Sequence, residues 1–231
     1  MPDQEHTHEA AGFVEGPPPS NFFTELAGIP VRFDRLPKQG FPYGAPPGQE
    51  RKFHCLASFE TQLVAAFADL TVRCPWGKPS LILTAGTWVD KPKFHGKGRA
   101  FDLDAVFWPT GQAVICKFYA KTSRWYLAIE AVMRRHFGLL LNHFYNADHV
   151  DHMHIDDSVP IQFNQDSRSE CVFVQAALRD VFGFPAVSIT GNYDWPMRDA
   201  LHKLNAGDLR KQVDYFAFLD RVVSLGFASA S

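Results

Sequence analysis

Apolar side chains recur every three to four residues in five stretches of the chain, and this spacing predicts amphipathic helices. The second stretch covers residues 125–137 and is followed by Gly138, a residue type that commonly ends helices. Its last turn carries Arg134 and Arg135, which we expect at a solvated helix end. The apolar positions are, in chain order, Leu56, Phe59, Leu63, Phe67 and Leu70; Trp125, Ile129, Val132 and Met133; Val174, Ala177, Leu178, Val181 and Phe182; Met197, Ala200, Leu201 and Leu204; and a last segment over residues 209–225.

Shorter stretches have the pattern of β-strands. Residues 81–84 form an apolar run that is typical of a buried strand. From residue 100 to 107 the side chains alternate between two faces, with Asp102 on one of them, which predicts a half-buried strand. A turn follows, and residues 113–116 are its predicted hairpin partner. The face opposite Asp102 consists of Phe101, Leu103, Ala105 and Phe107.

These elements predict an α+β fold, because strands and helices are mixed without regular βαβ alternation. We expect a small, mainly antiparallel sheet with flanking helices, followed by a small all-α domain. Residues 1–50 are rich in Pro and Gly and are predicted to form an extended arm. Residues 51–160 form the predicted sheet-containing domain, and residues 161–231 form the helical domain.

Composition and charge narrow the range of partners. The chain has 231 residues, of which 46% are hydrophobic and 21% charged, and its net charge of -2 gives no electrostatic basis for binding nucleic acid. No apolar run approaches about 18 residues, so we expect no membrane span. The first residues are acidic where a secretion signal needs basic ones. The oligomeric state stays open.

Four cysteines are present, Cys55, Cys74, Cys116 and Cys171, and none of them forms a C-x-x-C pair. A zinc site made of cysteines is therefore not expected. Two disulfides and four buried free thiols remain equally open from the sequence.

Candidate chemistry gathers in two segments, residues 95–104 and residues 149–156. Both are rich in His and Asp, and catalytic zinc sites use three such ligands with a fourth position left to water. The glycines between His95 and Asp102 allow a loop histidine to fold back beside a strand carboxylate. His152 and its neighbour two residues later would share one face of a strand.

These residues resemble the motifs of the zinc D,D-carboxypeptidases and related peptidoglycan endopeptidases. His95, Gly98, Ala100 and Asp102 occupy the positions of the first motif, and residues 151–154 (Asp-His-Met-His) those of the second. The run from Phe137 and Gly138 to Asp156 is most similar to the extensin-like C-terminal branch. The resemblance covers about residues 55–157 and implies the hedgehog/D,D-peptidase fold.

The resemblance implies that His95, Asp102 and His154 bind Zn²⁺. It also implies that Asp151 is the general base and that His152 lines the site. Strand alternation, however, places Asp151 on the face opposite His152 unless the strand begins after it, so His149 and His152 remain alternatives for the base. Trp88, on the loop that leads to His95, is a candidate wall of the substrate cleft.

The C-terminal part resembles a second family, the three-helix peptidoglycan-binding domains, at residues 174–178, 189–193 and 200–201. Together the two resemblances imply zinc-dependent hydrolysis of an amide bond in peptidoglycan peptides, by an endopeptidase or a D,D-carboxypeptidase. The alternative is a non-catalytic wall-binding protein that keeps the zinc fold. The expected partner is peptidoglycan or a muropeptide. Location in the cell envelope and release as a lysin both remain open.

Overall fold

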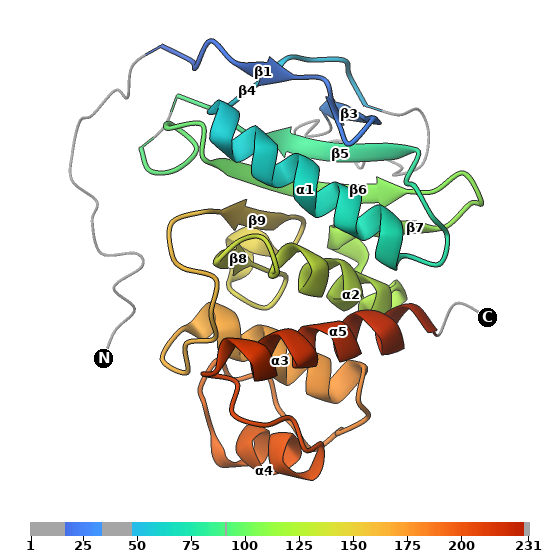
Figure 1. Ribbon diagram of the computed structural model, residues 1–231, viewed down its shortest axis with the longest axis vertical. Helices are drawn as coiled ribbons and strands as arrows, with labels where there is room; N and C mark the ends of the chain where they lie inside the picture. Colours follow the sequence, from blue (N-terminus) through green and yellow to red (C-terminus); the bar gives the residue numbers. More distant parts are fainter. Residues whose placement is uncertain (1–16, 34–47, 91, 229–231) are drawn as a thin grey trace.

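A computed structural model describes residues 17–33, 48–90 and 92–228 of the chain (Figure 1). The strands are β1 (Phe22–Phe23), β2 (Glu25–Leu26), β3 (Ile29–Phe33), β4 (Phe53–His54), β5 (Leu81–Gly86), β6 (Ala100–Phe107), β7 (Ala113–Ile115), β8 (Leu139–Leu141) and β9 (Met153–Asp156). The helices are α1 (Ala57–Arg73), η1 (Cys116–Lys121), α2 (Ser123–Met133), η2 (Ala147–His149), α3 (Arg168–Asp180), α4 (Trp195–Lys203) and α5 (Gln212–Ala228), where η marks the 3₁₀ type.

One seven-stranded sheet organises the fold. Its strands follow the order β2-β3-β5-β6-β9-β8, and β7 pairs with β6 beside this path. Strand β3 runs parallel to β5, whereas the other pairs in this sheet are antiparallel. The predicted α+β class is confirmed, but the sheet is mixed and includes strands from a region in which none was predicted.

Residues 17–33 contain three strands, β1, β2 and β3, that pair with other strands. The extended arm predicted for residues 1–50 is therefore wrong for this segment. Strand β1 pairs with β4, and β2 and β3 form a hairpin. The two turn residues, Ala27 and Gly28, both have positive φ, as in the tight turns that suit β-hairpins. The abundant Pro and Gly concealed a short set of buried apolar residues that belong to the hydrophobic core, namely Phe23, Leu26, Ile29 and Val31. Residues 1–16 and 34–47 of the predicted arm lie outside the described residues.

Helix α1 lies across one face of the sheet, and Figure 1 shows it in front of β5 and β6. The ring of Phe67 on α1 packs edge to face against the ring of Phe101 on β6, with centroids 6.1 Å apart. The predicted apolar face of this helix is buried from Phe59 onward, whereas Leu56 is the residue before the helix and is exposed. The helix therefore covers the sheet face that lies away from Asp102.

The alternation predicted for β6 breaks at Asp104. Thr84 of β5 pairs with Leu103 and Leu83 pairs with Ala105, so Asp104 is an extra residue in β6 and forms a β-bulge. Strict alternation would put Ala105 on the same face as Phe101 and Leu103. Because of the bulge, Val106 takes that position and joins the core. Asp102 precedes the bulge and keeps its predicted orientation.

The C-terminal part is helical as expected, but it packs directly on the sheet-containing part. Helix α5 crosses α2 so closely that a Cβ atom on Gly226 would lie 2.7 Å from the carbonyl oxygen of Arg124 and 2.8 Å from the Cβ of Ala128. The buried side chains of both parts form one continuous core. A separate all-α domain is therefore not confirmed.

A buried arginine joins the two parts. Arg134, at the end of α2, is only 1% exposed and donates hydrogen bonds to Glu130 on its own helix and to Glu170 on α3. Tyr215 on α5 donates to the other oxygen of Glu170 at 2.7 Å. Burial raises the pKa of both carboxyls, and the Arg134 guanidinium opposes that rise. The solvated helix end predicted for Arg134 is wrong, because its charge is compensated inside the core.

Replacing Arg134 with Met should lower the free energy of unfolding by about 3–5 kcal/mol, because two buried carboxyl groups would lose their shared cation. Urea denaturation followed by circular dichroism measures this loss. Arg135→Met is the matched control: Arg135 pairs with Asp220 and Asp69 near the surface and should cost at most about 1 kcal/mol. Equal losses in the two variants would contradict the assigned role of Arg134.

Candidate metal centre

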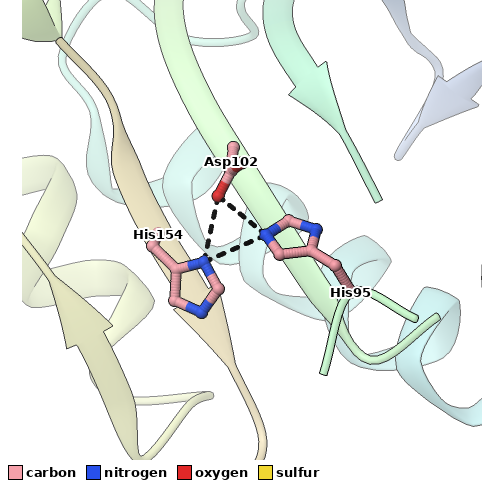
Figure 2. Close-up of side chains that lie close together, drawn as sticks. All are labelled: His95, Asp102 and His154. Carbon is pink, nitrogen blue, oxygen red and sulfur yellow. Dashed lines mark hydrogen bonds and ion pairs between the residues drawn. The ribbon is translucent and has the colours of Figure 1, made fainter. Parts of the chain in front are cut away.

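Two adjacent strands and one loop supply the three predicted ligands. Asp102 on β6 and His154 on β9 are direct cross-strand partners, so their side chains stand side by side on one face of the sheet. His95 comes from the loop between β5 and β6 (Figure 2). That loop folds back at Gly98, whose φ of +64° is a conformation that side chains with a Cβ rarely adopt.

The three side chains converge, and among the described residues they are the group whose spacing suits a metal ion. His95 Nε2 lies 3.1 Å from Asp102 Oδ1 and 3.2 Å from His154 Nδ1, and the latter two atoms are 3.0 Å apart. Ligands held about 2.0–2.1 Å from zinc in tetrahedral geometry are about 3.3 Å from one another. The arrangement therefore fits such an ion after displacements of a few tenths of an ångström.

Hydrogen bonds behind the two histidines fix which nitrogen faces the centre. His95 Nδ1 lies 2.5 Å from the carbonyl oxygen of Thr87, and His154 Nε2 lies 3.0 Å from Asp156 Oδ2. Both oxygens only accept, so these nitrogens carry protons, and a ring with no second proton turns a lone pair toward the other two side chains. With both rings neutral, three electron-pair donors would face one another, an arrangement that a bound cation or a proton between them would stabilise.

The pKa values of Asp102 and His154 also indicate that positive charge is favoured at this centre. Burial raises the pKa of Asp102, but hydrogen bonds from His154 and His95 outweigh it and hold that pKa well below its usual range. Burial lowers the pKa of His154, but its bonds to Asp102 and Asp156 prevail and raise that pKa to about 9. A proton on His154 thus supplies the positive charge, and a metal ion would take its place.

The backbone around Asp102 is fixed by an irregularity in β5. Gly86 pairs with Asp102 while Thr84 pairs with Leu103, so Ala85 is an extra residue in β5. The Thr84 hydroxyl donates to the carbonyl oxygen of Asp102 at 2.6 Å and accepts the N–H of Gly86 at 2.9 Å. Bulges next to functional sites commonly re-aim a side chain or end the pairing, and this one releases the chain into the loop that carries His95.

His152 stands beside the three ligands. It is 6% exposed, and its Nε2 lies 3.7 Å from Asp102 Oδ1. Its Nδ1 is 2.8 Å from Asp151 Oδ1, so the carboxylate accepts the Nδ1 proton and the lone pair of Nε2 faces the centre. Strand β9 begins at Met153, after Asp151. The carboxylate of Asp151 therefore lies behind the His152 ring, and its side chain is 43% exposed.

His149 and Trp88, the two other predicted site residues, lie nearby. The His149 ring is 5.1 Å from that of His152 and 6.0 Å from that of His154, and its Nδ1 lies 2.6 Å from Asn146 Oδ1. Trp88 is partly exposed, and its backbone N–H donates to the carbonyl oxygen of His54. A role of Trp88 in substrate binding stays a prediction.

The sequence did not single out Asp156 or Thr87, the residues that contact the outer nitrogens of His154 and His95. The carboxylate that contacts His154 belongs to Asp156, on the same strand. The signal was present, because Asp156 lies two residues beyond His154 and so shares its strand face. Thr87 makes its contact through its backbone carbonyl. Every residue type has this group, so the sequence could not reveal the contact.

Comparison of the chain with protein-family models, with curated proteins and with solved structures found no match. The function of the chain is therefore inferred from the geometry of the centre and from the motifs. Across the described residues, the helices lack the combination of length and apolar character that a bilayer crossing requires. All four cysteines, for which the sequence left two disulfides open, are buried free thiols.

Asp156→Asn should weaken zinc binding about 10- to 100-fold, because the ligand His154 loses the negative charge that fixes its tautomer and raises its basicity. Competition with a chromophoric chelator measures the dissociation constant. Asp157→Asn is the matched control, since the neighbouring carboxylate pairs with Arg99 at 2.9 Å and not with a ligand. If both variants bind zinc alike, Asp156 does not orient His154.

Proposed function

We propose that this protein is a zinc-dependent hydrolase that cleaves an amide bond in peptidoglycan peptides, as an endopeptidase or a D,D-carboxypeptidase. The observation that carries the proposal is the convergence of three electron-pair donors beside a histidine that is itself held by a carboxylate. Structural zinc sites are normally closed by a fourth protein ligand, whereas a hydrolytic site keeps an open position and a nearby base.

His95, Asp102 and His154 would hold the ion. Zinc in such a site supplies a Lewis acid that activates water and polarises a scissile carbonyl. His152 is placed to act as the general base: Asp151 holds its Nδ1 proton, so its Nε2 can take a proton from the attacking water and deliver it to the leaving amine. Asp151 then acts through His152, as a positioning residue that stabilises the imidazolium. This assignment selects among the three bases that the sequence left open.

The substrate class comes from the resemblance of the two motifs to peptidoglycan peptidases. Members of that family often hold a substrate carboxylate with an arginine just upstream of the first motif, where this chain has Ala85, Gly86, Thr87 and Trp88. The absence of that arginine favours an internal amide bond over a free C-terminus. We also propose that the fold around the centre is hedgehog/D,D-peptidase-like. The C-terminal helical part would then resemble a peptidoglycan-binding domain and keep the enzyme near its polymer.

His152→Ala should retain zinc, since His152 is not one of the three converging ligands, and should lose about 10²- to 10⁴-fold in rate. The test combines zinc content by atomic emission with muropeptide digestion followed by mass spectrometry. His136→Ala is the matched control, because His136 pairs with Asp69 between α2 and α1 and should leave both readouts unchanged.

Two results would contradict the proposal. Stoichiometric zinc without cleavage of any muropeptide would favour the alternative, a non-catalytic wall-binding protein that keeps the zinc fold. Full activity of His152→Ala would leave hydrolysis intact but remove His152 as the base.

A further inference from the structure

The loop that carries His95 receives little support from the core. Its described residues between Trp88 and Phe94 are exposed, and Lys93 among them has a positive φ of 76°. His95 itself is nevertheless buried and must hold one nitrogen in place to bind a metal. Hydrogen bonds therefore have to fix this exposed part of the loop.

We propose that Thr87 is a positioning residue for the metal ligand His95, anchored by β4 and the N-terminal segment 19–23. This inference rests on the zinc site of the proposed function but not on its substrate. It assigns a role in metal binding to a part of the chain that lies outside both sequence motifs.

The peptide unit between Thr87 and Trp88 links His95 to β4. In a trans peptide the C=O and the N–H point in opposite directions. The carbonyl of Thr87 accepts the Nδ1 proton of His95 at 2.5 Å, and the N–H of Trp88 donates to the carbonyl oxygen of His54 at 3.0 Å. The Thr87 hydroxyl donates to that same oxygen at 2.6 Å. Two bonds to one carbonyl therefore fix both the position and the direction of the Thr87 carbonyl.

Hydrogen bonds in such a chain polarise one another, so donation by Trp88 makes the Thr87 carbonyl a better acceptor for His95. A stronger acceptor at Nδ1 raises the basicity of Nε2, the nitrogen that faces the metal centre. Thr87 is 1% exposed, which keeps water from competing for these bonds. The chain thus orients His95 and favours the lone pair that a metal ion needs.

Strand β4 is itself held by the N-terminal segment. His54 Nδ1 lies 2.8 Å from the carbonyl oxygen of Pro19, and Cys55 donates its N–H to the carbonyl oxygen of Asn21 at 3.1 Å. Leu56 donates to the carbonyl oxygen of Gly98 at 2.9 Å. The start and the end of the loop that carries His95 are therefore both tied to β4 and the residues that follow it.

A tight contact closes this arrangement. A Cβ atom on Gly98 would lie 2.8 Å from Pro19 and 2.9 Å from the Cα of Cys55. Only glycine fits at that point, so the N-terminal segment presses directly on the turn after His95. The same segment thus reaches the loop from two sides, through β4 and through Gly98.

The test is zinc affinity of the full chain, measured by chelator competition, for Thr87→Val and Thr87→Ser. Thr87→Val keeps the shape of the side chain but removes the hydroxyl, and should weaken zinc binding about tenfold. Thr87→Ser keeps the hydroxyl and should bind within about twofold of wild type. Thr71→Val is the matched control, because the Thr71 hydroxyl bonds only within α1, to the carbonyl oxygen of Phe67.

Thermal melting of the zinc-free proteins accompanies the measurement. If Thr87→Val does not fold, Thr87→Ala replaces it, with the same expected loss of affinity. Zinc affinity of the hydroxyl-free variant within about twofold of wild type would overturn the inference. Failure of the wild type to bind zinc would instead overturn the metal site, and zinc binding without peptide cleavage would affect only the proposed reaction.

Discussion

The rest of the site depends on the pairing of β6 with β9, which sets Asp102 beside His154 at the centre of a buried sheet. A carboxylate and an imidazole in that position cannot keep their usual hydration, so their charge has to be balanced by a proton or a metal ion. The loop histidine His95 adds a third donor to the same point. A need for positive charge inside the protein is thus built into the strand register.

The surrounding structure serves to hold that arrangement. Bulges at Ala85 in β5 and at Asp104 in β6 interrupt the pairing on either side of Leu103, the residue that follows Asp102. The N-terminal segment and β4 fix the loop that carries His95, and Asp156 fixes His154. Further away, Arg134 ties the C-terminal helices to α2, next to the strands that supply the ligands. The site therefore draws on parts of the chain from residue 19 to residue 156.

The sequence predicted the elements that carry a regular pattern, such as α1, β6 and the helices after residue 168. It also predicted the three residues that converge, because their motifs combine residue types and spacings that few other sites need. It failed where long-range contacts decide: β3 joins the sheet beside β5, and Arg134 finds two carboxylates on different helices. Backbone interactions, such as the carbonyl of Thr87, leave no trace in residue type. Which of Asp151 and His152 faces the centre likewise depended on where β9 begins.

The central claim is that His95, Asp102 and His154 together bind one zinc ion through the atoms that now face one another. An anomalous difference map from crystals of the zinc-loaded protein, collected above and below the zinc edge, tests this most directly. We predict one peak within about 2.0–2.2 Å of His95 Nε2, Asp102 Oδ1 and His154 Nδ1, with no cysteine sulfur nearby. A peak bound elsewhere, or no peak at this position at full zinc occupancy, would contradict it.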